Sequence, residues 1–107
     1  MKIAVAAVEK NVEAEIGQQA GRAPFYLIFD ENGKVVETIS NPFSIGGGGA
    51  GFAVAKMLAD KKVDIVIAGR FGPNMAQALT ERGLKYYEKT GIVKDAILEF
   101  ISINGSV

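Results

Sequence analysis

The sequence predicts an α/β fold, in which helices cover both faces of a mostly parallel β-sheet. Three observations carry this prediction. The chain opens on a strand that is apolar on both faces, a tight turn at Asn32-Gly33 joins two further strands, and helical and extended segments then alternate. With 107 residues the chain has room for one hydrophobic core, so we expect a single domain over residues 1–107.

The first three expected strands cover residues 2–8, 25–29 and 34–40. In the first strand both alternating faces are apolar, which is typical of a central strand that is covered on both sides. The third strand mixes apolar and polar residues, which suits the edge of a sheet. Because the Asn32-Gly33 turn is short, the second and third strands should form an antiparallel hairpin.

The second half of the chain alternates between helix and strand, as parallel pairing with helical crossovers requires. The expected elements are a helix at 50–61, a strand at 63–68, a helix at 73–82, a strand at 84–87 and a helix at 92–103. Pro73 at the first position of the middle helix and Gly83 just past its end mark the bounds of that helix. Right-handed crossovers then place helices on the faces of a sheet with one antiparallel strand.

Several functions are excluded by residue types that the chain lacks. It contains no Cys, His or Trp, which excludes disulfides, thiol nucleophiles, Ser-His-Asp triads and Cys/His zinc sites. Its basic and acidic residues cancel, so a general nucleic-acid binder is not expected. The apolar run at residues 3–8 is too short to span a membrane, and no cleavage pattern follows it. We expect a cytoplasmic domain that binds neither nucleic acid nor membrane.

Three loops are expected to meet at the carboxyl ends of the strands, where open α/β sheets bind ligands. They are residues 9–23, 41–51 and 69–73. The first is long and has no clear periodicity, which is typical of a functional or a mobile segment. Arg22 and Arg70 each end an Ala-Gly-Arg tripeptide in these loops. Arginine binds carboxylates and phosphates through paired hydrogen bonds, and a surface ion pair is the alternative role.

The loop before the first expected helix is rich in glycine. It contains Gly46, Gly47, Gly48, Gly49 and Gly51. Their spacing fits a phosphate loop, but that motif requires Lys and then Ser or Thr where Phe52 and Ala53 stand. A dinucleotide fingerprint fails as well, because the next strand does not end on an acid. The remaining interpretations are a helix start whose bare N–H groups suit an anion, and close packing of the helix on the sheet.

The aromatic and amide side chains near these loops have mostly structural interpretations. Phe25, Phe29 and Phe52 are expected in the core, whereas Phe71, in a loop, is the aromatic residue least expected to be buried. Asn41 follows a strand and is expected as a turn residue.

Several segments together resemble a known family. In chain order they are residues 1–8, Gly21-Arg22-Ala23-Pro24-Phe25, Asn41-Pro42, Gly47-Gly48-Gly49-Ala50-Gly51, Leu58-Ala59-Asp60, residues 64–69 and Gly72-Pro73-Asn74. With them, essentially the whole chain resembles the dinitrogenase iron–molybdenum cofactor biosynthesis domain. The resemblance implies a ribonuclease-H-like motif, a three-layer α/β/α fold with three helices. It also implies a five-stranded mixed sheet of order 3-2-1-4-5, with strand two antiparallel.

The resemblance further implies a ligand class. Family members with assigned roles bind or carry the iron–molybdenum cofactor or its iron–sulfur precursors. The family often has His just before the Gly-Arg-Ala-Pro segment, where Gln19 and Ala20 stand, and ahead of the glycines, where Ser44, Ile45 and Gly46 stand. Iron–sulfur clusters are usually held by thiolate or imidazole, so side-chain ligation of iron is not expected here. Arginines and backbone N–H groups remain to hold an anionic cluster or another anion.

The first hypothesis is therefore a non-enzymatic binding domain for a cluster-like or other small anionic ligand. The candidate ligand-binding residues are Gln19, Arg22, Gly46, Gly47, Gly48, Gly49, Gly51, Arg70 and Asn74. No catalytic or metal-ligating residue is expected. The second hypothesis is an interaction module that docks on a protein partner through residues 9–23 or Phe71. An enzyme acting on a phosphorylated small molecule is the third, and the chain offers no credible base or nucleophile for it.

Overall fold

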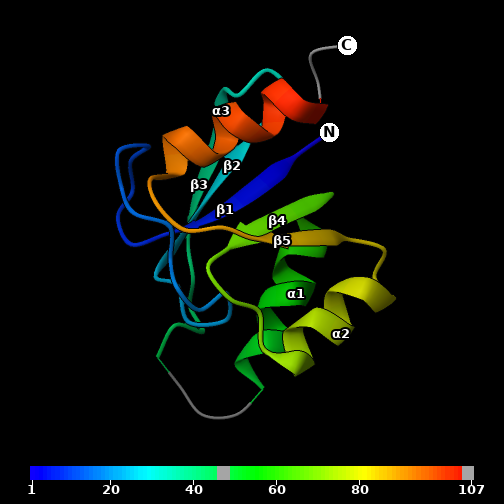
Figure 1. Cartoon of the computed structure of the whole chain (residues 1–107). Helices are drawn as coiled ribbons and strands as arrows, with labels where there is room; N and C mark the ends of the chain where they lie inside the picture. The colour runs from blue at the N-terminus through cyan, green and yellow to red at the C-terminus, as the bar shows by residue number, and fades with distance from the viewer. Residues whose placement is uncertain (46–48, 105–107) are drawn as a thin grey trace.

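The computed structural model describes residues 1–45 and 49–104. The strands are β1 (Ile3–Ala7), β2 (Phe25–Phe29), β3 (Val35–Ser40), β4 (Ile65–Ala68) and β5 (Lys85–Glu88). The helices are α1 (Ala50–Asp60), α2 (Pro73–Glu81) and α3 (Val93–Asn104). Figure 1 shows α3 on one face of the sheet and α1 with α2 on the other. The three-layer α/β/α fold is confirmed. The bounds of the elements agree with the expected ones to within one residue, except that β4 begins two residues later than expected.

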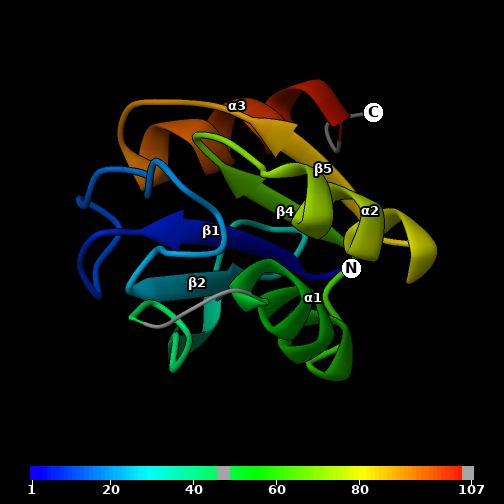
Figure 2. The ribbon, with the colours of Figure 1, turned by 90° about the horizontal axis from the view of Figure 1, so that it is seen from below.

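The sheet has the order β3-β2-β1-β4-β5. β2 is antiparallel to both of its neighbours, whereas β4 and β5 run parallel to β1. In the register of the central strand, Ile3 lies opposite Phe29 on β2 and Ile65 on β4. The carboxyl ends of β1, β4 and β5 therefore point to the same edge, at the left of the view in Figure 2. Both the predicted strand order and the antiparallel second strand are confirmed.

Side chains of β1 alternate between two hydrophobic clusters, one on each face of the sheet. Ile3, Val5 and Ala7 pack in the cluster under α3, and Ala4 and Ala6 pack in the cluster under α1 and α2. All five residues are fully buried. This is why a strand with two apolar faces occupies the centre of the sheet.

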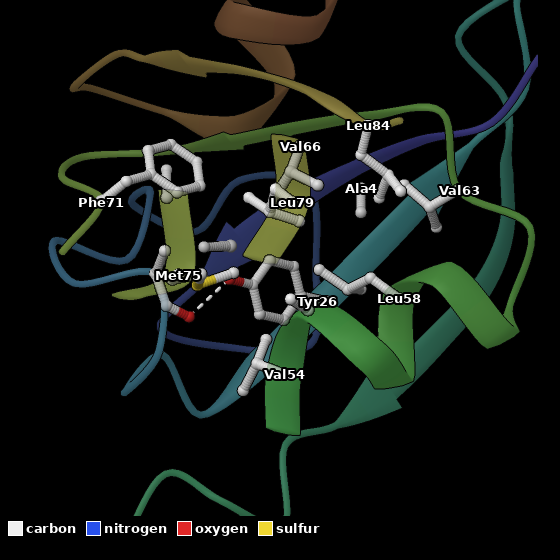
Figure 3. Packing of buried hydrophobic residues seen from close by; sticks show 14 of the residues in the cluster. Ala4, Tyr26, Val54, Leu58, Val63, Val66, Phe71, Met75, Leu79 and Leu84 are labelled. Carbon is white, nitrogen blue, oxygen red and sulfur yellow. Dashed lines mark hydrogen bonds between the residues drawn. The ribbon is translucent and has the colours of Figure 1, made fainter. Parts of the chain in front are cut away.

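Tyr26 on β2 is the largest side chain that is completely buried under α1 and α2. Figure 3 shows its ring between Leu58 of α1 and Met75 of α2, with its hydroxyl pointing to a loop carbonyl. That hydroxyl donates a hydrogen bond to the carbonyl oxygen of Ala20. Burial raises the pKa of the Tyr26 hydroxyl well above its ordinary value. Tyr26 thus joins the core to the loop that follows β1.

Replacing Tyr26 by phenylalanine keeps the ring packing and removes one buried hydrogen bond. We expect the free energy of unfolding to fall by about 1 kcal/mol at pH 7, measured by urea denaturation. Because the pKa of Tyr26 is higher in the folded than in the unfolded chain, the native chain loses stability as the pH rises above the unfolded value of about 10. The advantage over Tyr26→Phe should therefore shrink above that pH. An advantage that stays constant up to pH 11 would contradict this role.

The long segment between β1 and β2 is anchored at several points. The N–H of Gly17 donates to the carbonyl of Ala6 at 2.9 Å, and the N–H of Val93 at the start of α3 donates to the carbonyl of Ala14 at 2.9 Å. Ala14, Ile16, Ala20 and Ala23 are buried. Buried apolar residues, most of them alanine, hold this segment on the sheet at irregular spacing, which explains why it shows no period in the sequence.

Two aromatic predictions are wrong. Phe71 is only 8% exposed, and its ring lies 4.8 Å from that of Tyr86 on β5. Phe52 is 47% exposed, because it lies on the opposite side of α1 from the buried Val54. Phe29 is buried as predicted. Phe71 is therefore a poor candidate for a contact with a protein partner.

Among the described residues, none of the helices combines the length and the apolar character needed to cross a lipid bilayer.

Candidate functional site

Segments from the three predicted loops surround one cavity of about 460 Å³ at the carboxyl edge of the sheet. Residues 19–22 form one wall, residues 49–51 at the start of α1 form the second, and Arg70 with residues 72–75 forms the third. We call this the rim cavity. It combines three separate segments from residues 19 to 75 of the chain, which meet where β1 and β4 end.

The rim cavity gathers every predicted ligand-binding residue that the structure describes. These are Gln19, Arg22, Gly49, Gly51, Arg70 and Asn74. Gly46, Gly47 and Gly48 lie outside the described residues. The structure thus places these residues around one cavity, whereas ligand binding by them stays a prediction.

Arg70 is positioned by main-chain pairing just beyond the end of β4. The N–H of Gly69 donates to the carbonyl of Gly17, and the N–H of Ala20 donates to the carbonyl of Arg70, both at 2.9 Å. The two segments approach so closely that a Cβ atom on residue 69 would lie 2.9 Å from the Cα and the carbonyl oxygen of Gln18. Only glycine allows this approach, which holds Arg70 beside the 19–22 wall.

Arg22 is positioned by the buried Asn41, whose place in the sequence predicts only a turn residue. Asn41 is 4% exposed, and its Nδ2 donates to the carbonyl of Ala23 at 2.9 Å and to that of Gly21 at 3.3 Å. Its Oδ1 accepts from the N–H of Phe43 at 2.9 Å. Asn41 thus holds the two peptide carbonyls on either side of Arg22. The one sequence signal for this role is that Asn41 is a polar residue between an edge strand and Pro42.

Two helices start at the rim cavity. Each follows a glycine N-cap, Gly49 or Gly72, which has no side chain to accept from the first N–H groups. Neither helix has an acidic residue in its first turn. The first N–H groups of a helix have no partner within that helix, and they carry the positive end of its dipole. Both helix starts therefore favour negative charge in the cavity.

Gly49 and Gly51, the two described glycines of the glycine-rich loop, are each required for a different structural reason. Gly49 has a φ of 89°, a backbone conformation that favours glycine. Gly51 lies against α2, where a Cβ atom would come within 3.0 Å of the Cβ and 3.1 Å of the backbone N of Met75. The packing interpretation of glycine is thus supported for Gly51, although its neighbour is a helix rather than the sheet.

The charges at the rim cavity are of one sign. Arg22 and Arg70 line it, and no Asp or Glu occurs among the described residues that do so. Within residues 1–45 and 49–104, no carboxylate forms an ion pair with the Arg70 guanidinium. With Gln19 and Asn74, the side chains offer hydrogen-bond donors to an anion.

The cavity does not fit direct ligation of iron. The chain has no Cys or His, and the described residues bring together no group of three acidic side chains that could hold a metal ion. Met75 lines the cavity but is 2% exposed, and its thioether lies beside Tyr26 in the core (Figure 3). A metal cluster in this cavity would have to be held by charge and hydrogen bonds.

The fold and the cavity define a small α/β/α domain with a positively charged site at the carboxyl edge of a mixed sheet. The chain belongs to the family described as dinitrogenase iron–molybdenum cofactor, whose model matches residues 1–103. The family resemblance in the sequence is thereby confirmed. No functionally curated protein matches the chain significantly.

Solved structures agree with this assignment. The apo form of the orange protein from Desulfovibrio gigas is 27% identical, with a TM-score of 0.88 over 94% of this chain and 87% of that one. A Thermotoga protein provisionally named as a NifB protein is 30% identical, with a TM-score of 0.80 over the same shares. A protein from Methanocaldococcus jannaschii, provisionally named a dinitrogenase, is 19% identical over 95% of this chain and 88% of that one. Its TM-score of 0.67 shows a shared fold.

Proposed function

We propose that this chain is a non-enzymatic binding domain that carries a preassembled anionic ligand of the iron–molybdenum cofactor type in the rim cavity. One observation carries the proposal. Arg22 and Arg70, from separate loops, meet the starts of two helices around a cavity that no described carboxylate lines. Membership of the cofactor family supports the class of ligand.

The lining residues also support the way in which the ligand would be held. Guanidinium and N–H groups donate hydrogen bonds to the negatively charged surface of a cluster, and they do not bond metal ions. Because the chain offers neither thiolate nor imidazole, the metal ions of the cluster must arrive with their own ligands in place. The role is therefore carriage of a finished or nearly finished cluster rather than its assembly from free iron.

The chemistry of the lining supports a role without catalysis. The described residues around the rim cavity carry guanidinium, carboxamide and thioether groups and main-chain atoms. None of these serves readily as a general base or a nucleophile at neutral pH.

Removing either arginine should weaken binding strongly. In anaerobic titrations with isolated iron–molybdenum cofactor, we expect Arg22→Ala and Arg70→Ala each to lower affinity by about tenfold to a hundredfold, the value of a hydrogen bond to a charged group. Arg82→Ala is the matched control, because Arg82 follows the far end of α2 and does not line the cavity. Absorbance and calorimetric signals should both saturate in the native chain.

Two results would count against the proposal. One is the absence of saturable binding by the native chain. The other is that Arg22→Ala and Arg70→Ala bind the cofactor as tightly as the control variant Arg82→Ala does.

A second candidate function is docking on a protein partner. An apolar groove of about 430 Å³ runs between Phe43 and the side of α1 that carries Ala53 and Met57, and the exposed Phe52 belongs to the same helix. Partner binding that persists in the Arg22→Ala, Arg70→Ala double variant and is lost in Phe43→Ser would favour this function.

A further inference from the structure

A second, smaller cavity adjoins the rim cavity. It has a volume of about 240 Å³ and is lined by Gln18, Gln19, Gly69, Arg70 and Thr90. Gln19 and Arg70 line both cavities, so they form a common wall between them. A ligand that contacts Arg70 in the rim cavity therefore lies next to this second space.

The second cavity is part of the sheet edge rather than a gap between free side chains. It lies where the segments beyond the ends of three strands are joined by main-chain bonds. The N–H of Gly69 donates to the carbonyl of Gly17, and the N–H of Lys89 donates to that of Ala68, both at 2.9 Å. The contact between Gly69 and Gln18 leaves no room for these segments to approach further. The backbone thus holds the walls of the cavity in place.

The lining of the second cavity differs chemically from that of the rim cavity. Apart from the shared Arg70, its side chains are the carboxamides of Gln18 and Gln19 and the hydroxyl of Thr90. Carboxamides and hydroxyls both donate and accept hydrogen bonds, so they can pair with both the O–H and the oxygen of a ligand hydroxyl group, whereas an arginine can only donate. All three side chains are exposed, and within residues 1–45 and 49–104 none of them forms a hydrogen bond with another protein group, so their polar atoms face the space of the cavity.

We propose that the second cavity is a subsite for an uncharged, hydroxyl-bearing arm of the ligand whose anionic part occupies the rim cavity. The proposal rests on the proposed function, because Arg70 in the common wall must contact the anion. The arm extends past Arg70 from the rim cavity into the second cavity. There it donates hydrogen bonds to Gln18 and Thr90 and accepts hydrogen bonds from them. The ligand class is then an anion with a short polar organic substituent, rather than a bare oxyanion or a bare inorganic cluster.

Phosphate and glycerol 3-phosphate test the subsite, because they present similar anionic groups with and without a hydroxylated arm. In calorimetric titrations of the native chain we expect glycerol 3-phosphate to bind roughly 5-fold to 10-fold more tightly than phosphate, the value of one or two net hydrogen bonds. Thr90→Val and Gln18→Ala should remove this ratio and leave phosphate affinity unchanged. Thr38→Val, on the opposite edge strand β3, should preserve the ratio.

Equal affinity for the two compounds would overturn the subsite, and so would a ratio that survives both Thr90→Val and Gln18→Ala. If the native chain binds the iron–molybdenum cofactor but neither phosphate compound, the subsite is overturned and the proposed function stands. If it binds neither the cofactor nor the phosphate compounds, the proposed function fails and the subsite fails with it.

Discussion

Gly69→Ala is expected to destabilise the fold by about 1–3 kcal/mol, the usual cost of forcing an extra methyl group into a filled space. The added Cβ would lie 2.9 Å from the Cα and the carbonyl oxygen of Gln18, and both of these are main-chain atoms that cannot rotate away. Relief requires the two segments to separate, which strains the bonds from Gly69 to Gly17 and from Ala20 to Arg70. Urea denaturation measures the loss of stability.

The same change should also weaken anion binding, because the pairing that it strains holds Arg70 beside Gln19. Gly72→Ala is the matched control. It also lies at the rim cavity, but a Cβ atom there meets nothing within 4 Å, and its φ of −68° is open to alanine. We expect a change within about 0.5 kcal/mol, since a poorer N-cap offsets the smaller entropy of the unfolded chain. Equal effects of the two substitutions would contradict the steric argument.

Much of the fold follows from local patterns. The two apolar faces of residues 2–8 predict a central strand, the Asn32-Gly33 turn predicts a hairpin, and Pro73 with Gly83 predicts the bounds of α2. These signals act between residues that are close in the chain. The full strand order needed the family resemblance, because pairing of β1 with β4 depends on contacts between residues about sixty positions apart.

The location of the candidate site could be predicted from the sequence, but the contacts that hold its residues in place could not. Arg22 and Arg70 could be assigned to one edge because the strands before their loops, β1 and β4, end on the same side of a parallel pair. Phe52 was placed in the core wrongly, because a helix turns its side chains by position and aromatic character does not reveal which face is buried. The hydrogen bond from Tyr26 to Ala20 forms only after β2 packs under the segment that follows β1, so no local sequence pattern predicts it.

The sequence predicts only a turn at Asn41, because the contacts of its side chain form only after distant segments pack together. Replacing Asn41 should lower the stability of the fold substantially. Asn41→Ala removes the hydrogen bonds to the carbonyls of Gly21 and Ala23 and to the N–H of Phe43. Because the site is buried, we expect the free energy of unfolding to fall by roughly 2–4 kcal/mol, the cost of leaving buried polar groups unpaired. Thermal and urea denaturation measure this loss. Cofactor affinity should fall as well, since the carbonyls on either side of Arg22 lose their anchor.

Asn41→Asp separates the donor role of this side chain from its shape. The carboxylate can still accept from Phe43, but its second oxygen faces the carbonyls of Gly21 and Ala23 instead of donating to them. Burial and these carbonyls should raise the pKa of the new carboxyl, so the variant should gain stability relative to the native chain as the pH falls and the carboxyl is protonated. Asn11→Ala is the control, because exposed Asn11 accepts one N–H, that of Glu13, and should lose about 0.5 kcal/mol. An Asn41→Asp variant as stable as the native chain at neutral pH would show that Asn41 does not hold the Arg22 loop through its amide.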